Sequence, residues 1–120
     1  EKASIVLFST VAVQTGMPYH ASVASAKGAV EGLTRTLAAE FAPSIRVNCI
    51  APSITNTPLA EKLLNNETKV KASEDRHPLK RIGSAEEIAQ TVEFLLSEKS
   101  GFITGQIIKI DGGISSIKSI

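Results

Sequence analysis

The sequence of 120 residues has one cysteine, Cys49, and almost no net charge. A single cysteine excludes an internal disulfide and is typical of proteins in a reducing compartment. Thirteen basic and twelve acidic side chains give a formal net charge of +1. Because the two signs are interspersed, no basic patch for nucleic acid or for an acidic membrane surface is expected. The longest apolar runs are too short to span a membrane, and the first residues lack a signal-peptide profile. These absences favour a cytoplasmic protein.

Three short segments have the composition of buried strands. Residues 4–8, 45–51 and 106–110 are mainly apolar and rich in β-branched side chains, as strands buried on both faces are. Cys49 lies within the second of them, so we expect a buried structural thiol rather than a reactive one.

Two long helices are predicted between these strands. Ser22 is the expected N-cap of the first, which ends near Phe41 because Pro43 cannot continue a helix. The run Ser84-Ala85-Glu86-Glu87 is a capping box that begins the second. Strands that alternate with helices predict one α/β domain over residues 1–120, with parallel strands joined by right-handed crossovers.

The first helix has two distinct stripes on a helical wheel. An apolar stripe is expected to pack on the sheet and consists of Val23, Ala26, Val30, Leu33, Leu37 and Phe41. A stripe of small residues points away from it and consists of Ala24, Gly28, Gly32 and Ala39. Glycine inside a helix costs about 1 kcal/mol relative to alanine. Either another helix packs closely on this stripe, or the two glycines are tolerated on a solvated face.

Residues 53–81 form a long, polar segment interrupted by proline, with a possible short helix near residues 59–71. A loop of this length in a compact domain is usually a lid or a binding segment. We therefore expect this segment to cover a ligand.

Several blocks occur in an order that resembles the short-chain dehydrogenase/reductase family. The blocks are Phe8-Ser9-Thr10, Ala24-Ser25-Ala26-Lys27-Gly28-Ala29-Val30, Ile45-Arg46-Val47-Asn48-Cys49-Ile50-Ala51-Pro52, Pro78-Leu79-Lys80-Arg81-Ile82-Gly83 and Asp111-Gly112-Gly113. The resemblance implies the C-terminal half of a Rossmann-like, doubly wound parallel sheet, with three parallel strands and flanking helices. It also implies NAD or NADP as cofactor and a small carbonyl or alcohol as substrate.

The glycine-rich turn that holds a dinucleotide pyrophosphate is absent from the sequence. Such a turn connects a first strand to a helix N-terminus, but no glycine cluster follows any predicted strand before a helix. We therefore expect this chain alone to bind NAD(P) weakly or not at all.

The resemblance assigns catalytic roles to particular positions. Lys27 matches the lysine that lowers the pKa of a catalytic tyrosine and holds the nicotinamide ribose, but Val23 occupies the position of that tyrosine, four residues earlier. Thr10 matches the serine that donates a hydrogen bond to the substrate oxygen, and Ser9 takes that position if the register shifts by one residue. Tyr19, or His20 next to it, is an alternative proton donor only if their loop folds back over the site.

Further positions resemble the family's cofactor contacts. Pro52, Thr55 and Thr57 follow the second strand where the family contacts the nicotinamide carboxamide or the pyrophosphate, and Ser53 replaces the family's glycine. Thr57 is also a predicted N-cap, with Pro58 at the first helical position. His77 has no second histidine or cysteine at ligand spacing, so no metal site is expected.

Two functions remain possible from the sequence. The first is an NAD(P)-dependent oxidoreductase that transfers hydride to or from a carbonyl or alcohol. The second is a catalytically silent homologue that acts as an oligomerising or binding module, which Val23 favours. In either case the small-residue stripe and the resemblance predict a homodimer or homotetramer.

Overall fold

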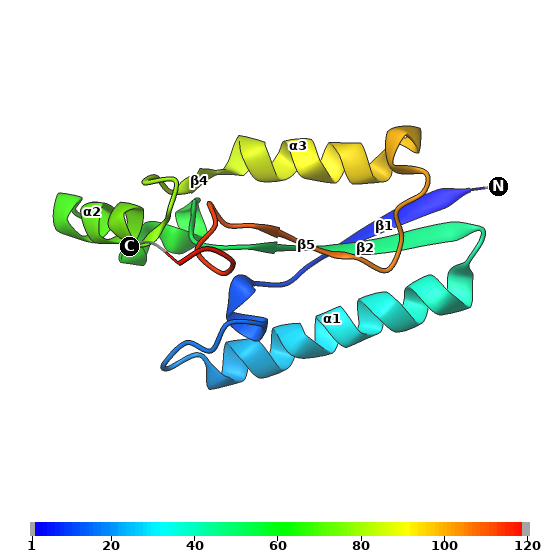
Figure 1. The fold of residues 1–120 in the computed structure, drawn as a ribbon, viewed down its shortest axis with the longest axis horizontal. Coiled ribbons are helices and arrows are strands. Elements are labelled where there is room, and N and C mark those ends of the chain that lie inside the picture. The colour runs from blue at the N-terminus through cyan, green and yellow to red at the C-terminus, as the bar shows by residue number, and fades with distance from the viewer. Residues whose placement is uncertain (1, 119–120) are drawn as a thin grey trace.

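Three parallel strands form the centre of the fold, in the order β1-β2-β5 (Figure 1). The structure is a computed structural model, and it describes residues 2–118. The strands are β1 (Ala3–Phe8), β2 (Ile45–Pro52) and β5 (Ile107–Ile110). Ile5 pairs with Val47 across β1 and β2, and Ile50 pairs with Ile108 across β2 and β5. The sequence prediction of three parallel strands is confirmed.

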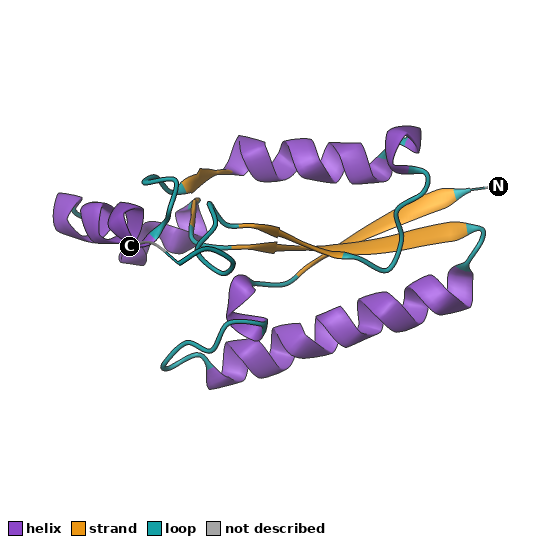
Figure 2. Cartoon of the chain, viewed as in Figure 1, coloured by secondary structure: helices purple, strands orange, loops and turns teal. Residues whose placement is uncertain are grey.

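Helices cover both faces of this sheet (Figure 2). Helix α1 (Ala21–Phe41) packs mainly on β2, and α3 (Ala85–Leu96) packs on β1 from the opposite face. The core is densest in the central strand, where Val47, Cys49 and Ile50 are fully buried. The fold is therefore the layered, parallel α/β arrangement that the sequence predicted.

A side chain of β2 fixes the end of α3. The Arg46 guanidinium donates hydrogen bonds to the main-chain oxygens of four residues and to one hydroxyl. The acceptors are Ser100 O at 2.8 Å, Ser100 Oγ at 2.9 Å, Ser97 O at 2.9 Å, Leu95 O at 3.2 Å and Ile103 O at 3.2 Å. The last carbonyls of a helix have no partner inside the helix. Arg46 supplies those partners and ties α3 and η3 (Glu98–Ser100) to the sheet.

The buried face of α1 differs from the predicted one. Val23 and Leu33 are 46% and 49% exposed, and Ala26 is also exposed, although all three were assigned to the stripe facing the sheet. The residues buried instead are Glu31, Thr34 and Ala38, which lie between the two predicted stripes. Hydropathy misplaced this face because Glu31 and Thr34 are polar but find hydrogen-bond partners inside the protein.

The small-residue stripe of α1 has two environments. A Cβ on Gly28 would lie 3.8 Å from Cγ1 of Val13, which belongs to the short helix η1 (Val11–Val13). A Cβ on Gly32 would have no atom within 4 Å. Gly28 therefore allows close approach of a segment of the same chain. Gly32 and Ala39 lie on an exposed surface.

The start of α1 was also predicted incorrectly. The helix begins at Ala21 after His20, whose side chain makes no capping hydrogen bond, and Ser22 lies inside the first turn. By contrast, the capping box at α3 is confirmed: Ser84 Oγ accepts from Glu87 N, and the Glu87 carboxylate accepts from Ser84 N.

Residues 53–81 contain more structure than the single short helix expected near residues 59–71. They form β3 (Thr55–Asn56), η2 (Pro58–Leu63) and α2 (Glu67–Arg76), and β3 pairs with β4 (Gly83–Ser84) just beyond them. The segment lies beyond the carboxyl ends of the central strands, where ligands bind in open α/β sheets (Figures 1 and 2). Among residues 2–118, no helix has both the length and the hydropathy needed to cross a membrane.

Candidate functional site

The carboxyl ends of β1 and β2 bring the predicted site residues to one edge of the sheet. Thr10 follows β1, and Thr55 and Thr57 follow β2. Thr10 is partly exposed, and its Oγ1 accepts a hydrogen bond from Ala12 N at 3.3 Å as the N-cap of η1. Its main chain is therefore held in a fixed turn directly after the strand.

Lys27 reaches the same edge from α1. Its Nζ donates to the main-chain oxygen of Phe8 at 3.2 Å, at the last residue of β1 and two residues before Thr10. Ser9 Oγ in turn lies 3.5 Å from Lys27 O. The ammonium group therefore lies at the end of β1, two residues before Thr10.

The two alternative residues lie in different surroundings. Ser9 is only 6% exposed, and its hydroxyl faces α1, so it is not the open hydroxyl of the pair. Tyr19 is fully exposed and has a φ of 65°, a left-handed conformation that is rare for an aromatic residue. Val23 lies one helical turn before Lys27 and is 46% exposed. No described contact brings Tyr19 to Lys27.

Glu31 is a site residue that the sequence did not reveal. It is 3% exposed, and its carboxylate accepts from Ser9 Oγ at 2.5 Å and from Gln14 Nε2 at 3.2 Å. Gln14 is the C-cap of η1 and Thr10 is its N-cap. Glu31 therefore holds both ends of the turn that carries Thr10, one helical turn after Lys27. In the sequence it looks like a charge on a solvated face, and its partners lie 17 and 22 residues away.

The segment after β2 is held by hydrogen bonds to main-chain oxygens of β5 and of the segment itself. Pro52 pairs with Ile110 of β5, and Ser53 N donates to Ile110 O at 3.2 Å. Thr55 Oγ1 donates to Ser53 O at 3.0 Å. Thr57 is the N-cap residue of η2 with Pro58 at its start, as expected, but its side chain makes no capping hydrogen bond.

His77, at which the sequence predicts no metal site, lies between the end of α2 and the residue that follows β2. It is 2% exposed, with Nδ1 2.7 Å from Ser73 O and Nε2 2.9 Å from Ser53 Oγ. Within the described part of the chain, no three His, Cys, Asp or Glu side chains are grouped so as to hold a metal ion.

The pKa values of Glu87, Asp111 and Cys49 differ from their ordinary values. The hydrogen bond from Arg81 lowers the pKa of Glu87 to about 2, and the two side chains form a bidentate pair at 2.7 and 2.6 Å. Burial raises the pKa of Asp111, but hydrogen bonds from Ser115 and from Gly113 N outweigh burial and leave that pKa below its ordinary value. Burial raises the pKa of the Cys49 thiol, which fits the structural role predicted for it.

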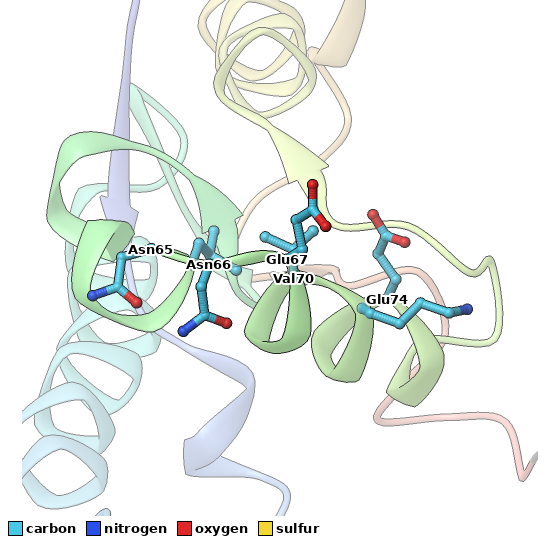
Figure 3. Close-up of a pocket in the computed structure, with 7 residues that line it drawn as sticks. Asn65, Asn66, Glu67, Val70 and Glu74 are labelled. Atoms are coloured by element: carbon cyan, nitrogen blue, oxygen red, sulfur yellow. The ribbon is translucent and has the colours of Figure 1, made fainter.

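A broad, open groove runs along the start of α2 (Figure 3). It has a volume of about 590 Å³ and is lined by Leu64, Asn65, Asn66, Glu67, Val70, Lys71 and Glu74. The carboxylates of Glu67 and Glu74 point to the same side of α2 (Figure 3). The groove belongs to residues 53–81 and is open to solvent.

Comparisons with known proteins agree with this arrangement. The family model described as enoyl-(acyl carrier protein) reductase matches residues 1–115. The chain belongs to the short-chain dehydrogenase/reductase family. It is 44% identical over 112 residues to the 3-oxoacyl-(acyl-carrier-protein) reductase FabG of Thermotoga maritima, a match that covers 92% of this chain and 45% of the relative.

Solved structures of short-chain dehydrogenases have the same fold. The aldohexose dehydrogenase of Thermoplasma acidophilum superposes with a TM-score of 0.92 at 34% identity, over 100% of this chain and 51% of that one. A 4-hydroxyisoleucine dehydrogenase complexed with NADH gives a TM-score of 0.91 at 33% identity, over 98% of this chain and 49% of that one. This short-chain dehydrogenase/reductase chain therefore spans about half the length of the relatives that it matches.

Proposed function

We propose that this chain forms the nicotinamide- and substrate-facing half of an NAD(P)-dependent oxidoreductase acting on a small carbonyl or alcohol. The observation that carries the proposal is the Lys27 ammonium group, held 3.2 Å from Phe8 O at the carboxyl end of β1. That position lies beside Thr10 and at the same sheet edge as Thr55 and Thr57. A cation and hydroxyls at this edge suit the ribose and carboxamide of a nicotinamide.

The chemistry divides between the cofactor and the residues of this chain. A bound nicotinamide would supply or accept the hydride. Lys27 would hydrogen-bond to the ribose, Thr55 and Thr57 would orient the nicotinamide half, and Thr10 would donate to the substrate oxygen. Residues 53–81 would cover the ligand and set its identity. The choice between NAD and NADP depends on the adenosine side, which these residues do not form.

The residues of this chain fit only part of a dinucleotide. The connection from β1 to α1 contains a single glycine, Gly16, and it is not the glycine-rich turn that binds a pyrophosphate. We infer that the isolated chain binds NADH or NADPH weakly. Micromolar affinity in a calorimetric titration would contradict that inference.

Weak binding is measurable by nuclear magnetic resonance. We expect millimolar NADH or nicotinamide mononucleotide to shift the amide signals of Lys27, Thr55 and Thr57. Lys27→Met should abolish the shifts, because the substitution removes the ammonium group while keeping most of the side-chain volume. Lys99→Met, at an exposed position in η3, is the matched control. Identical shifts in both variants, or no shifts at these residues, would refute the proposed site.

Val23 limits the reaction that this site supports. Valine has no proton to exchange, so we propose that the usual tyrosine-dependent proton transfer does not occur in this chain, even when a cofactor is bound. Tyr19 does not substitute for it in the described conformation, because its side chain is fully exposed.

We further propose that the chain assembles as a homodimer or homotetramer through α1. Gly32 and Ala39 leave part of the small-residue stripe exposed on that helix. A two-fold axis would pair this surface with itself, which is the commonest arrangement of soluble homo-oligomers.

A further inference from the structure

The most deeply buried histidine of the described chain is bonded at both ring nitrogens. His77 Nδ1 lies 2.7 Å from Ser73 O, and Nε2 lies 2.9 Å from Ser53 Oγ. A carbonyl oxygen only accepts hydrogen bonds, so Nδ1 carries the proton in the neutral ring. The lone pair is then on Nε2, and the Ser53 hydroxyl must donate to it. This direction of donation is the one by which a general base activates a serine.

The pair opens into a small cavity that is separate from the Lys27 contact. The cavity has a volume of about 120 Å³ and is lined by Ser53, His77, Leu79, Arg81, Gly83, Glu87, Ile110, Asp111 and Gly112. At about 30 Å³ for each water molecule, it has room for roughly four. A volume of this size matches a short acyl chain better than a long one.

We propose that Ser53 is a nucleophile and His77 its general base, in a site that takes short acyl groups from neutral esters or thioesters. Three features of an activated serine are present: the hydroxyl, the base bonded to it, and a third group that orients the base. Here the third group is the Ser73 carbonyl at the end of α2 rather than a carboxylate.

The reaction is a balanced acyl transfer. The Ser53 oxygen attacks the carbonyl carbon of the ester while its proton moves to His77 Nε2. The carbon–oxygen bond to the alcohol then breaks, the alcohol leaves with the proton from Nε2, and an acyl-Ser53 ester remains. Water attacks this ester by the same route, releasing the carboxylic acid and restoring the serine. Neither an oxidant nor a nicotinamide takes part, so this activity is independent of the proposed oxidoreductase function.

Charges on the cavity wall select against anionic substrates. Arg81 is neutralised by its bidentate contact with Glu87, which leaves the Asp111 carboxylate as the uncompensated charge among the lining side chains. The low pKa values of Glu87 and Asp111 keep both carboxylates ionised near neutral pH. A phosphate or carboxylate ligand would be repelled, whereas an uncharged acyl group would not.

The test is acylation of the intact chain by p-nitrophenyl acetate, followed by mass spectrometry of its peptides. We expect one acetyl group on Ser53, and a faster reaction with the acetate than with the hexanoate ester. Ser53→Ala should abolish that label. His77→Asn keeps an amide N–H to donate to Ser73 O but removes the base. It should slow acetylation of Ser53 at least about 100-fold, because general-base catalysis typically contributes 10²–10⁴-fold.

A matched control comes from α1. Ser25 is exposed, and its hydroxyl bonds only to the Ala21 carbonyl at 2.7 Å, so Ser25→Ala should leave the rate unchanged. If His77→Asn fails to fold, Ser53→Thr takes its place. Threonine keeps a hydroxyl but adds a methyl group beside His77, so this variant should slow the acetylation of residue 53 without loss of structure. Acetyl groups found on lysines alone, or Ser53 acetylated equally fast in His77→Asn, would overturn the proposal.

Discussion

Replacing Glu31 with alanine should destabilise the protein strongly, although the sequence shows only a helix glutamate. The carboxylate is 3% exposed and accepts hydrogen bonds from Ser9 Oγ and Gln14 Nε2. Each hydrogen bond to a charged group contributes about 1.5–3 kcal/mol. Removing the carboxylate also removes the free-energy cost of burying it, which offsets part of the loss. We therefore expect Glu31→Ala to lower the free energy of unfolding by roughly 2–4 kcal/mol.

Urea denaturation followed by circular dichroism measures this change. Glu31→Gln should cost less than Glu31→Ala, since the amide keeps one oxygen acceptor and the shape of the side chain. Glu40→Ala is the control, because Glu40 is exposed on the same helix and such changes usually stay within about 0.5 kcal/mol. If Glu31→Ala is as stable as Glu40→Ala, with the same dependence on urea, the buried carboxylate does not hold the Thr10 turn.

Four further outcomes are expected. In a hybrid where this chain replaces the matching part of the Thermotoga reductase, Val23→Tyr should create ketone reduction, measurable as the oxidation of NADH or NADPH; no gain would show that Lys27 and Thr10 are not placed for catalysis. Arg46→Met should lower the free energy of unfolding by roughly 3 kcal/mol, since several carbonyls around the end of α3 lose their donor; an unchanged urea midpoint would contradict this. Glu87 has its pKa lowered from 4.5 to about 2, so its contribution to stability is complete above about pH 4.5 and is lost as the pH falls towards 2, and Glu87→Gln should flatten that part of the acid-unfolding curve. Finally, Gly32→Leu should shift an oligomer towards monomer in light scattering with an unchanged circular dichroism spectrum, and an oligomer that persists would exclude the α1 surface.

Local signals explain which parts of the fold could be predicted from the sequence. The three strands are short, apolar and β-branched, and the capping box Ser84–Glu87 is complete within four residues. The parallel order follows from the alternation of strands and helices. Motif resemblance predicts Lys27 and Thr10 as site residues, and in the structure Lys27 contacts Phe8 O, two residues before Thr10.

The features that could not be predicted depend on contacts between distant residues. The buried face of α1 is set by Glu31, whose partners are Ser9 and Gln14, so hydropathy alone placed Val23 and Leu33 on the wrong side. The Ser53–His77 bond spans 24 residues and has no sequence motif. Helix α2 has few apolar residues, which left no periodicity from which its bounds could be read.

The position of β2 in the sheet has a consequence for synthesis on the ribosome. β2 lies between β1 and β5, so one of its edges can pair once residue 52 has left the exit tunnel. The other edge can pair only after residues 107–110 have been synthesised. At a translation rate of about 5–20 residues per second, the ribosome needs roughly 3–11 s to make the intervening segment. During that interval the main-chain groups of the central strand, including those of the fully buried Cys49 and Ile50, remain open to pairing with another nascent chain. Slow translation of residues 53–106 would prolong this exposure. A chaperone that covers the unpaired edge of β2 would prevent pairing with another chain during that interval.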